Sequence, residues 1–117
     1  MTGRRSQRLR LVDIALQISA IQYATVTIGR EEFEGDWLRR SAVERGLEVI
    51  SEATRHLDES WKLSEPEIPW RRIADIGNWL RHAYDRVDPE LIWLVTTDEL
   101  PKLSAAVTRL LDQVSED

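Results

Sequence analysis

Apolar residues recur at steps of three and four along most of the chain, which is the spacing that places them on one face of an α-helix. The first such run covers residues 9–28 and closes at Gly29. A second and longer run begins at Glu31 or Asp36 and continues to Trp61. No alternation of period two is long enough to form a sheet. The pattern therefore predicts an all-α protein.

Prolines mark the beginnings of the remaining predicted helices, because proline lacks a backbone N–H and fits best in the first helical turn. Pro69 is expected to open a third helix that runs to about Tyr84. Pro89 is expected to open a fourth helix with Asp88 as its N-cap. Pro101 is expected to open or kink a fifth helix.

Short connections between successive helices favour antiparallel neighbours, so the predicted architecture is an up-and-down bundle of four to five helices. The chain has 117 residues, the size of one ordinary domain, and we expect a single domain over residues 1–117. Residues 1–8, which are rich in arginine, are expected to be a mobile basic N-terminal segment. The expected core residues are Leu16, Ile18, Ile21, Val43, Leu47, Ile50, Leu57, Ile73, Ile76, Leu80, Leu91, Val95, Leu103 and Leu110.

Composition narrows the class of protein further. The chain has no cysteine, which removes disulfide scaffolds, thiolate zinc sites and cysteine nucleophiles. Its 16 basic and 21 acidic residues give a net charge of −5, so a whole-surface grip on nucleic acid is not expected, although a local arginine patch could bind it. Polar residues interrupt the apolar run near the N-terminus, which is therefore neither a signal peptide nor a membrane span. We expect a cytoplasmic protein without a metal or cofactor.

The predicted third helix has one apolar face and one polar face. Arg71, Asp75, Asn78, His82 and Asp85 follow alternating steps of four and three, which places them on one side. A polar stripe of this kind is usually a solvated surface. It can also be a reactive site, because an imidazole that titrates at about pH 6.5 takes up and releases protons at neutral pH. Both interpretations stay open on these residues alone.

A second cluster of charge lies on the long predicted helix. Glu44, Glu48 and Glu52 stand at intervals of four, where like charges repel by roughly a few tenths of a kcal/mol per pair. Arg40 and His56 extend the same line and could offset this repulsion. We interpret the cluster as a solvated acidic edge rather than a metal site, because no histidine lies among the carboxylates at ligand spacing.

Several blocks of sequence carry a resemblance to a known family. They are 41–53 (SAVERGLEVISEA), 68–70 (IPW), 77–84 (GNWLRHAY), Val87-Asp88 with Trp93, and Leu100-Pro101 with Leu103. In order and spacing these blocks resemble the HepT family within the HEPN superfamily, and the resemblance spans nearly the whole chain.

This resemblance implies an all-helical, HEPN-like homodimer that acts as a toxin by cleaving RNA without a metal ion. It also implies a partner, an antitoxin of the minimal nucleotidyltransferase type called MntA. The family's signature is an arginine, usually followed by a polar residue, then a histidine, and a tyrosine two positions beyond the histidine. His82 matches the histidine and Asn78 the polar residue. Tyr84 matches the tyrosine, which in the family receives AMP from the partner nucleotidyltransferase.

The chain departs from this signature at the arginine. The positions that the spacing allows for it hold Gly77, Ile76 and Asp75. In the family, the histidine and arginine assist the attack of a ribose 2′-hydroxyl on the adjacent phosphate. This reaction needs a base for the proton and a cation for the charge on the phosphorane. None of the three side chains supplies that cation.

Two hypotheses for the function follow. In the first, the chain is an endoribonuclease in which His82, Asn78 and Arg81 act in a cleft shared by two copies. Arg81 lies one turn after Gly77 and could reach the vacated space. In the second, Arg81 pairs with Asp85, the activity is lost, and the chain is a binding module that recruits a nucleotidyltransferase partner.

Overall fold

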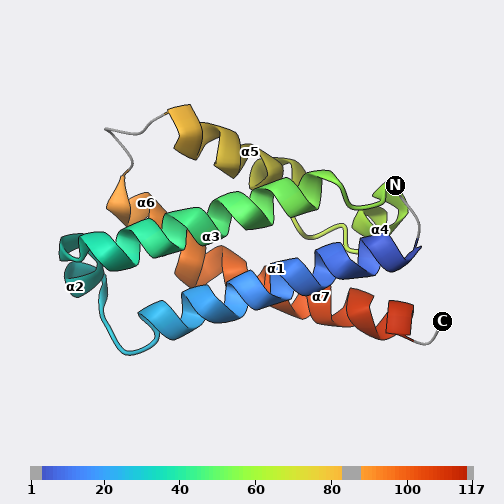
Figure 1. The fold of residues 1–117 in the computed structure, drawn as a ribbon, viewed down its shortest axis with the longest axis horizontal. Coiled ribbons are helices and arrows are strands. Elements are labelled where there is room, and N and C mark those ends of the chain that lie inside the picture. The colour runs from blue at the N-terminus through green and yellow to red at the C-terminus, as the bar shows by residue number, and fades with distance from the viewer. Residues whose placement is uncertain (1–3, 83–87, 116–117) are drawn as a thin grey trace.

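Four long helices run up and down side by side in the computed structural model, which describes residues 4–82 and 88–115. They are α1 (Arg4–Thr25), α3 (Trp37–Arg55), α5 (Trp70–His82) and α7 (Leu100–Ser115) (Figure 1). The described residues include no strand, and none of the helices among them is both long enough and apolar enough to cross a membrane. The prediction of an all-α, up-and-down bundle is confirmed.

The long helix predicted from Glu31 or Asp36 to Trp61 is divided. The structure has α2 (Arg30–Gly35), then α3, then α4 (Glu59–Leu63). Asp36 makes the first division, because its backbone is extended and its side chain accepts a hydrogen bond of 3.1 Å from the N–H of Arg39. This bond is an N-cap for α3. A start at Asp36 is therefore confirmed, whereas continuation to Trp61 is wrong.

The second division, between α3 and α4, depends on a residue that is remote in the sequence. Gln7 of α1 is fully buried, and its amide donates to the carbonyl of His56 (2.9 Å) and accepts from the N–H of Asp58 (2.7 Å). Buried backbone groups at a helix end need such partners. Helix α1 begins at Arg4, so this contact lies inside the segment 1–8 for which mobility was predicted.

The predicted fourth and fifth helices form one continuous helical rod. Helix α6 (Pro89–Leu94) begins as predicted, with the Asp88 side chain accepting from the N–H of Glu90 at 3.0 Å. It passes through a wider π-helical segment, η1 (Val95–Glu99), directly into α7. Pro101 follows this segment and cannot donate a backbone hydrogen bond, so the helix is irregular just before it.

Most of the predicted core is buried, and the exceptions are informative. Leu16 is 62% exposed and Leu91 is 41% exposed, so their assignment to the core is wrong, and Ile76 is half-buried. Helix α1 has apolar residues on two opposite sides, and Leu16 lies on the side that faces outward. Only the side that carries Ile14 and Ile18 packs inward.

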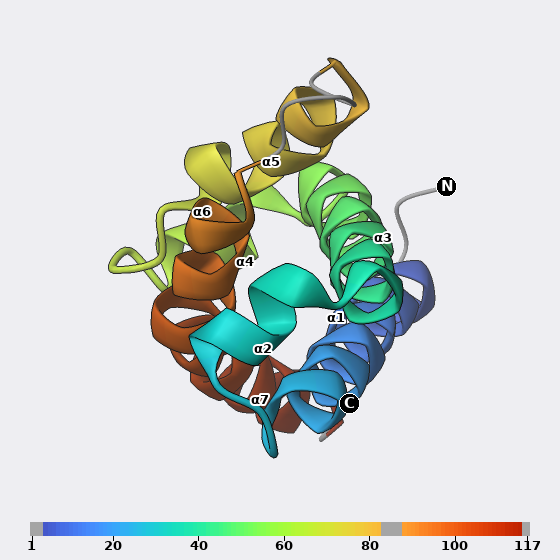
Figure 2. The ribbon, with the colours of Figure 1, turned by 90° about the vertical axis from the view of Figure 1, so that its left-hand side faces the viewer.

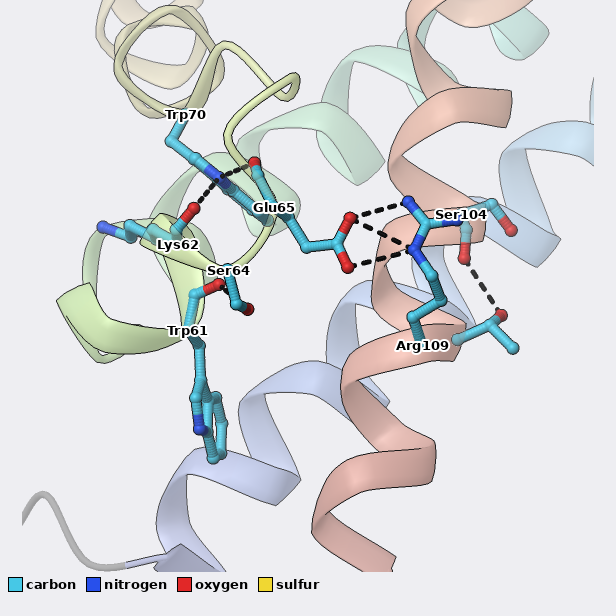
Figure 3. A network of polar contacts seen from close by, with 8 residues as sticks. Trp61, Lys62, Ser64, Glu65, Trp70, Ser104 and Arg109 are labelled. Atoms are coloured by element: carbon cyan, nitrogen blue, oxygen red, sulfur yellow. Dashed lines mark hydrogen bonds and ion pairs between the residues drawn. The ribbon is translucent and has the colours of Figure 1, made fainter.

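The loop between α4 and α5 is held to α7 by an ion pair (Figure 3). The carboxylate of Glu65 accepts hydrogen bonds from Nε and Nη2 of Arg109 at 2.6–3.1 Å. The indole N–H of Trp70 donates to the carbonyls of Lys62 (3.1 Å) and Glu65 (3.0 Å), which closes the loop on itself. The hydrogen bonds from Arg109 hold the pKa of Glu65 below its ordinary value of 4.5.

Replacing Gln7 by Leu is expected to lower the free energy of unfolding by about 1–3 kcal/mol, because the carbonyl of His56 and the N–H of Asp58 would lose their partner. Chemical denaturation followed by circular dichroism measures this change. Gln22→Leu alters an exposed glutamine of the same helix and is expected to change stability by less than about 0.5 kcal/mol. Equal stability of the Gln7→Leu and wild-type proteins would contradict the bridging role.

The ion pair of Glu65 is expected to make stability depend on pH. Because the folded state lowers the pKa of Glu65, its stabilisation is complete above the ordinary value of 4.5 and is lost as protonation proceeds in more acidic solution. Glu65→Gln should therefore melt below the wild type at neutral pH and approach it in acid. Thermal unfolding of both proteins at several pH values tests this. Glu59→Gln, an exposed carboxylate in α4, is the control. A Tm difference for Glu65→Gln that is constant with pH would refute it.

Candidate active site

Helix α5 lies beyond α3 at one side of the bundle (Figure 2). Ile73 and Leu80 are buried on its inner side. Arg71, Asp75 and Asn78 are exposed on its outer side. For the described side chains, the two faces predicted for this helix are therefore confirmed, and the polar face is directed away from the core; the predicted positions of His82, Ala83 and Asp85 on these faces lie outside this description.

Ser51 of α3 fixes α5 in place. Its hydroxyl is buried, donates to the carbonyl of Ala74 (2.6 Å) and accepts from the N–H of Gly77 (3.0 Å). Arg55, one turn further along α3, donates from Nε (3.0 Å) and Nη2 (2.8 Å) to the same carbonyl of Ala74. These bonds determine which side of α5 faces outward. Sequence reasoning missed both residues; the available signal was the hydroxyl of Ser51 on the mainly apolar side of α3.

Gly77, one of the three residues at the positions where the resemblance implies an arginine, belongs to this contact between helices. It is buried, and its N–H is the one that reaches Ser51. Its exposed neighbour Asn78 lies on the outer side of the helix. Gly77 therefore contributes to helix packing in this chain.

The other predicted site residues lie at the C-terminal end of α5. Arg81 and His82 are its last two residues. Asn78 precedes His82 by four positions, so the helical register puts their backbone positions on one side of α5. Tyr84, the predicted AMP acceptor, lies outside the described residues. So does Asp85, the possible ion-pair partner of Arg81.

Two further arginines stand near the start of α5. Arg72 extends across to η1, where its Nη2 lies 2.9 Å from a carboxylate oxygen of Glu99. This ion pair links α5 to the helical rod of α6 and α7. Arg71 is exposed on the outer side of α5, seven positions before Asn78.

A shallow, mainly apolar cavity of about 250 Å³ lies beside this outer side, between α5 and the rod of α6 and η1. Trp79 and Ile76 line it from α5, and Leu91 lines it from α6. Arg72 and Asp75 contribute its polar edge. The cavity thus combines an aromatic ring with a cation, which is a combination that proteins use to hold unstacked nucleobases.

Two of the three glutamates of the predicted acidic edge on α3 lie close to basic side chains. Nε2 of His56 lies 3.2 Å from Glu52, and Nη1 of Arg45 lies 3.5 Å from Glu48. Partial burial raises the pKa of Glu44. Within the described ranges, no three acidic, histidine or cysteine residues are grouped so that they could hold a metal ion.

Comparison with known proteins identifies the family to which this chain is similar. The family profile described as ribonuclease HepT-like matches residues 14–110. A probable ribonuclease HepT of Thermococcus cleftensis is 36% identical over 107 residues, which cover 92% of this chain and 97% of that protein. A putative RNase of Methanocaldococcus jannaschii is 30% identical over 105 residues, which cover 90% and 96%. No solved structure matches the chain.

The described residues define an all-helical protein in which α5 has a polar outer side and ends at His82. The chain belongs to the HepT-like ribonuclease family. The family resemblance predicted from the sequence blocks is confirmed.

Proposed function

We propose that the chain is a metal-independent endoribonuclease toxin whose site is formed by Asn78, Arg81 and His82. The observation that carries this proposal is the position of Asn78 on the exposed side of α5, one turn before the terminal His82. Ser51 supports the proposal because it fixes the rotation of this helix. Membership of a ribonuclease family supports RNA as the substrate.

In the proposed reaction, His82 accepts the proton of a ribose 2′-hydroxyl as the 2′-oxygen bonds to the adjacent phosphorus. The bond from phosphorus to the 5′-oxygen breaks, the leaving oxygen takes up a proton from water, and His82 returns the proton it accepted to the solvent. The products are a 2′,3′-cyclic phosphate and a 5′-hydroxyl end. Arg81 offsets the negative charge that develops on the phosphorane, and the amide of Asn78 donates a hydrogen bond to a phosphate oxygen.

The surroundings of α5 support binding of single-stranded RNA. A chain with a net charge of −5 has to attract phosphates through a local patch, and Arg71 and Arg72 lie on the same helix as the proposed site. The apolar cavity with Trp79 can receive an unstacked base next to them. We further propose that two copies form a cleft in which both outer sides of α5 face the substrate, and that the protein acts in the cytoplasm.

The chain has two histidines, which provides a matched test of catalysis. His82→Ala is expected to abolish cleavage of a fluorescent RNA in the presence of EDTA. Arg81→Ala should reduce the rate by about 10²–10³, the usual effect of removing one transition-state contact. His56→Ala, which changes an exposed histidine paired with Glu52 on α3, should cleave at the wild-type rate. Circular dichroism confirms that each variant is folded.

Two outcomes would contradict this assignment. Cleavage that persists in His82→Ala with EDTA present would place the activity at another site. Absence of cleavage by the wild-type protein would favour the second candidate function, a binding module that recruits a nucleotidyltransferase. That alternative is favoured by one observation, the presence of buried Gly77 where the family signature has arginine.

We also propose that Tyr84 accepts AMP from a cognate MntA-like nucleotidyltransferase, which would add bulk and negative charge beside the phosphate site. Incubation with ATP and this partner is expected to add one or more AMP groups, measured by mass spectrometry, and to stop RNA cleavage. Tyr84→Phe should remain unmodified and active. Tyr23→Phe, which alters an exposed tyrosine on α1, should be modified normally. Modification that survives in Tyr84→Phe would reject Tyr84 as the acceptor.

A further inference from the structure

Helix α1 has apolar residues on two opposite sides, and only one side is covered. Leu11 and Ile18 belong to the inner side and are buried. Leu9, Leu16 and Tyr23 on the opposite side are 53%, 62% and 84% exposed. With the half-buried Val12 and the exposed Ala20 between them, they form what we call the α1 outer row: Leu9, Val12, Leu16, Ala20 and Tyr23.

The outer row is symmetric about its centre. From Leu9 to Tyr23, its members are separated by three, four, four and three positions, so Leu16 is the midpoint. If two copies of α1 pack antiparallel around a two-fold axis at Leu16, Leu16 meets its own copy. Val12 then lies opposite the partner's Ala20, and Leu9 lies opposite the partner's Tyr23. The row is therefore complementary to itself, as a two-fold interface requires.

The charges of α1 fit the same arrangement. The N-terminal end of α1 carries Arg4, Arg5 and Arg8, and its first turn has no acidic residue. Its last turn has no basic residue. Basic residues at the N-terminal end are unfavourable in an isolated helix, because the helix dipole already places partial positive charge there. Antiparallel pairing places the arginines of one copy near the C-terminal end of the other, where the helix carries partial negative charge and where the carbonyl of Ala24 already accepts a hydrogen bond from Arg39.

The flanking positions do not bring like charges together in this arrangement. Asp13 falls opposite the partner's Ser19, and Arg10 falls opposite the partner's Gln22. Both pairings follow from the midpoint at Leu16. These two pairings of α1 therefore add no repulsion between like charges.

Residues of α3 extend the apolar surface beyond α1. Leu38 and Trp37 at the start of α3 are 72% and 67% exposed. They lie near the end of α1, because the neighbouring Arg39 donates a hydrogen bond of 2.8 Å to the carbonyl of Ala24. A single helix pair covers less than the roughly 800 Å² per partner of an ordinary stable interface, so this extension enlarges the available contact.

We propose that the α1 outer row binds a second copy of this chain around a two-fold axis at Leu16. Helices α1 and α5 lie on different sides of α3, so this contact is separate from the proposed cleft at α5 (Figure 2). It does not depend on ribonuclease activity. Together, the α1 contact and the α5 cleft would build assemblies larger than a dimer.

Single cysteines test the geometry, because the natural chain has none. Under mild oxidation, Leu16→Cys is expected to form a disulfide-linked dimer by itself. Leu9→Cys should not, since its two copies would lie about 21 Å apart along the helices, beyond the reach of a disulfide. An equal mixture of Leu9→Cys and Tyr23→Cys should cross-link. Leu63→Cys, at an exposed position of α4, is the control for random collision.

Opposite charges at the axis give a second test. Leu16→Glu and Leu16→Lys should each lower the mass measured by sedimentation to that of a smaller assembly, and mixing the two should restore the wild-type mass. Cross-linking of Leu16→Cys no faster than Leu63→Cys would overturn the proposal, as would an unchanged mass of Leu16→Glu or a monomeric wild type. RNA cleavage by folded Leu16→Glu is measured in parallel. Loss of association with retained cleavage separates this proposal from the proposed function.

Discussion

The close packing of α3 between α1 and α5 is the constraint on which the rest of the structure depends. Towards α1, Gly46 leaves no room for a side chain, because a Cβ atom there would lie 2.8 Å from Cδ1 of the buried Ile21. Towards α5, Ser51 places one small hydroxyl between the carbonyl of Ala74 and the N–H of Gly77. Small residues thus allow both neighbours to approach, and the second contact also fixes how α5 is rotated.

The helical class and the two faces of α5 could be predicted because they depend on local periodicity. Ile73 and Leu80 recur at helical spacing, and they are buried as this spacing predicts. The ends of α3 could be predicted only in part. Asp36 carries a capping signal in its own side chain, whereas the end before α4 is stabilised by Gln7, 51 positions before the Asp58 that it contacts. No local pattern contains that pairing.

Leu16 shows a different limit of sequence reasoning. A helix with apolar residues on every side is usually buried on every side, so the spacing, which sets Leu16 opposite Ile14 and Ile18, did not show that only one of these sides faces the core. The structure separates them, because α3 and α7 cover only one side of α1. The prediction therefore identified the apolar residues correctly but could not assign each to the core or to the surface.

For the candidate site, register and family resemblance predict Asn78 and His82, but no sequence pattern predicts the contacts that orient the helix carrying them. Those contacts come from α3 and η1, through Ser51 and through Glu99, which pairs with Arg72. The same ion pair bears on the proposed chemistry. An arginine that already contacts a carboxylate contributes less to attraction of phosphate, so the proposed RNA binding would depend more on stacking in the cavity than on Arg72. The proposed reaction would itself exclude DNA, because DNA lacks the 2′-hydroxyl that attacks the phosphate.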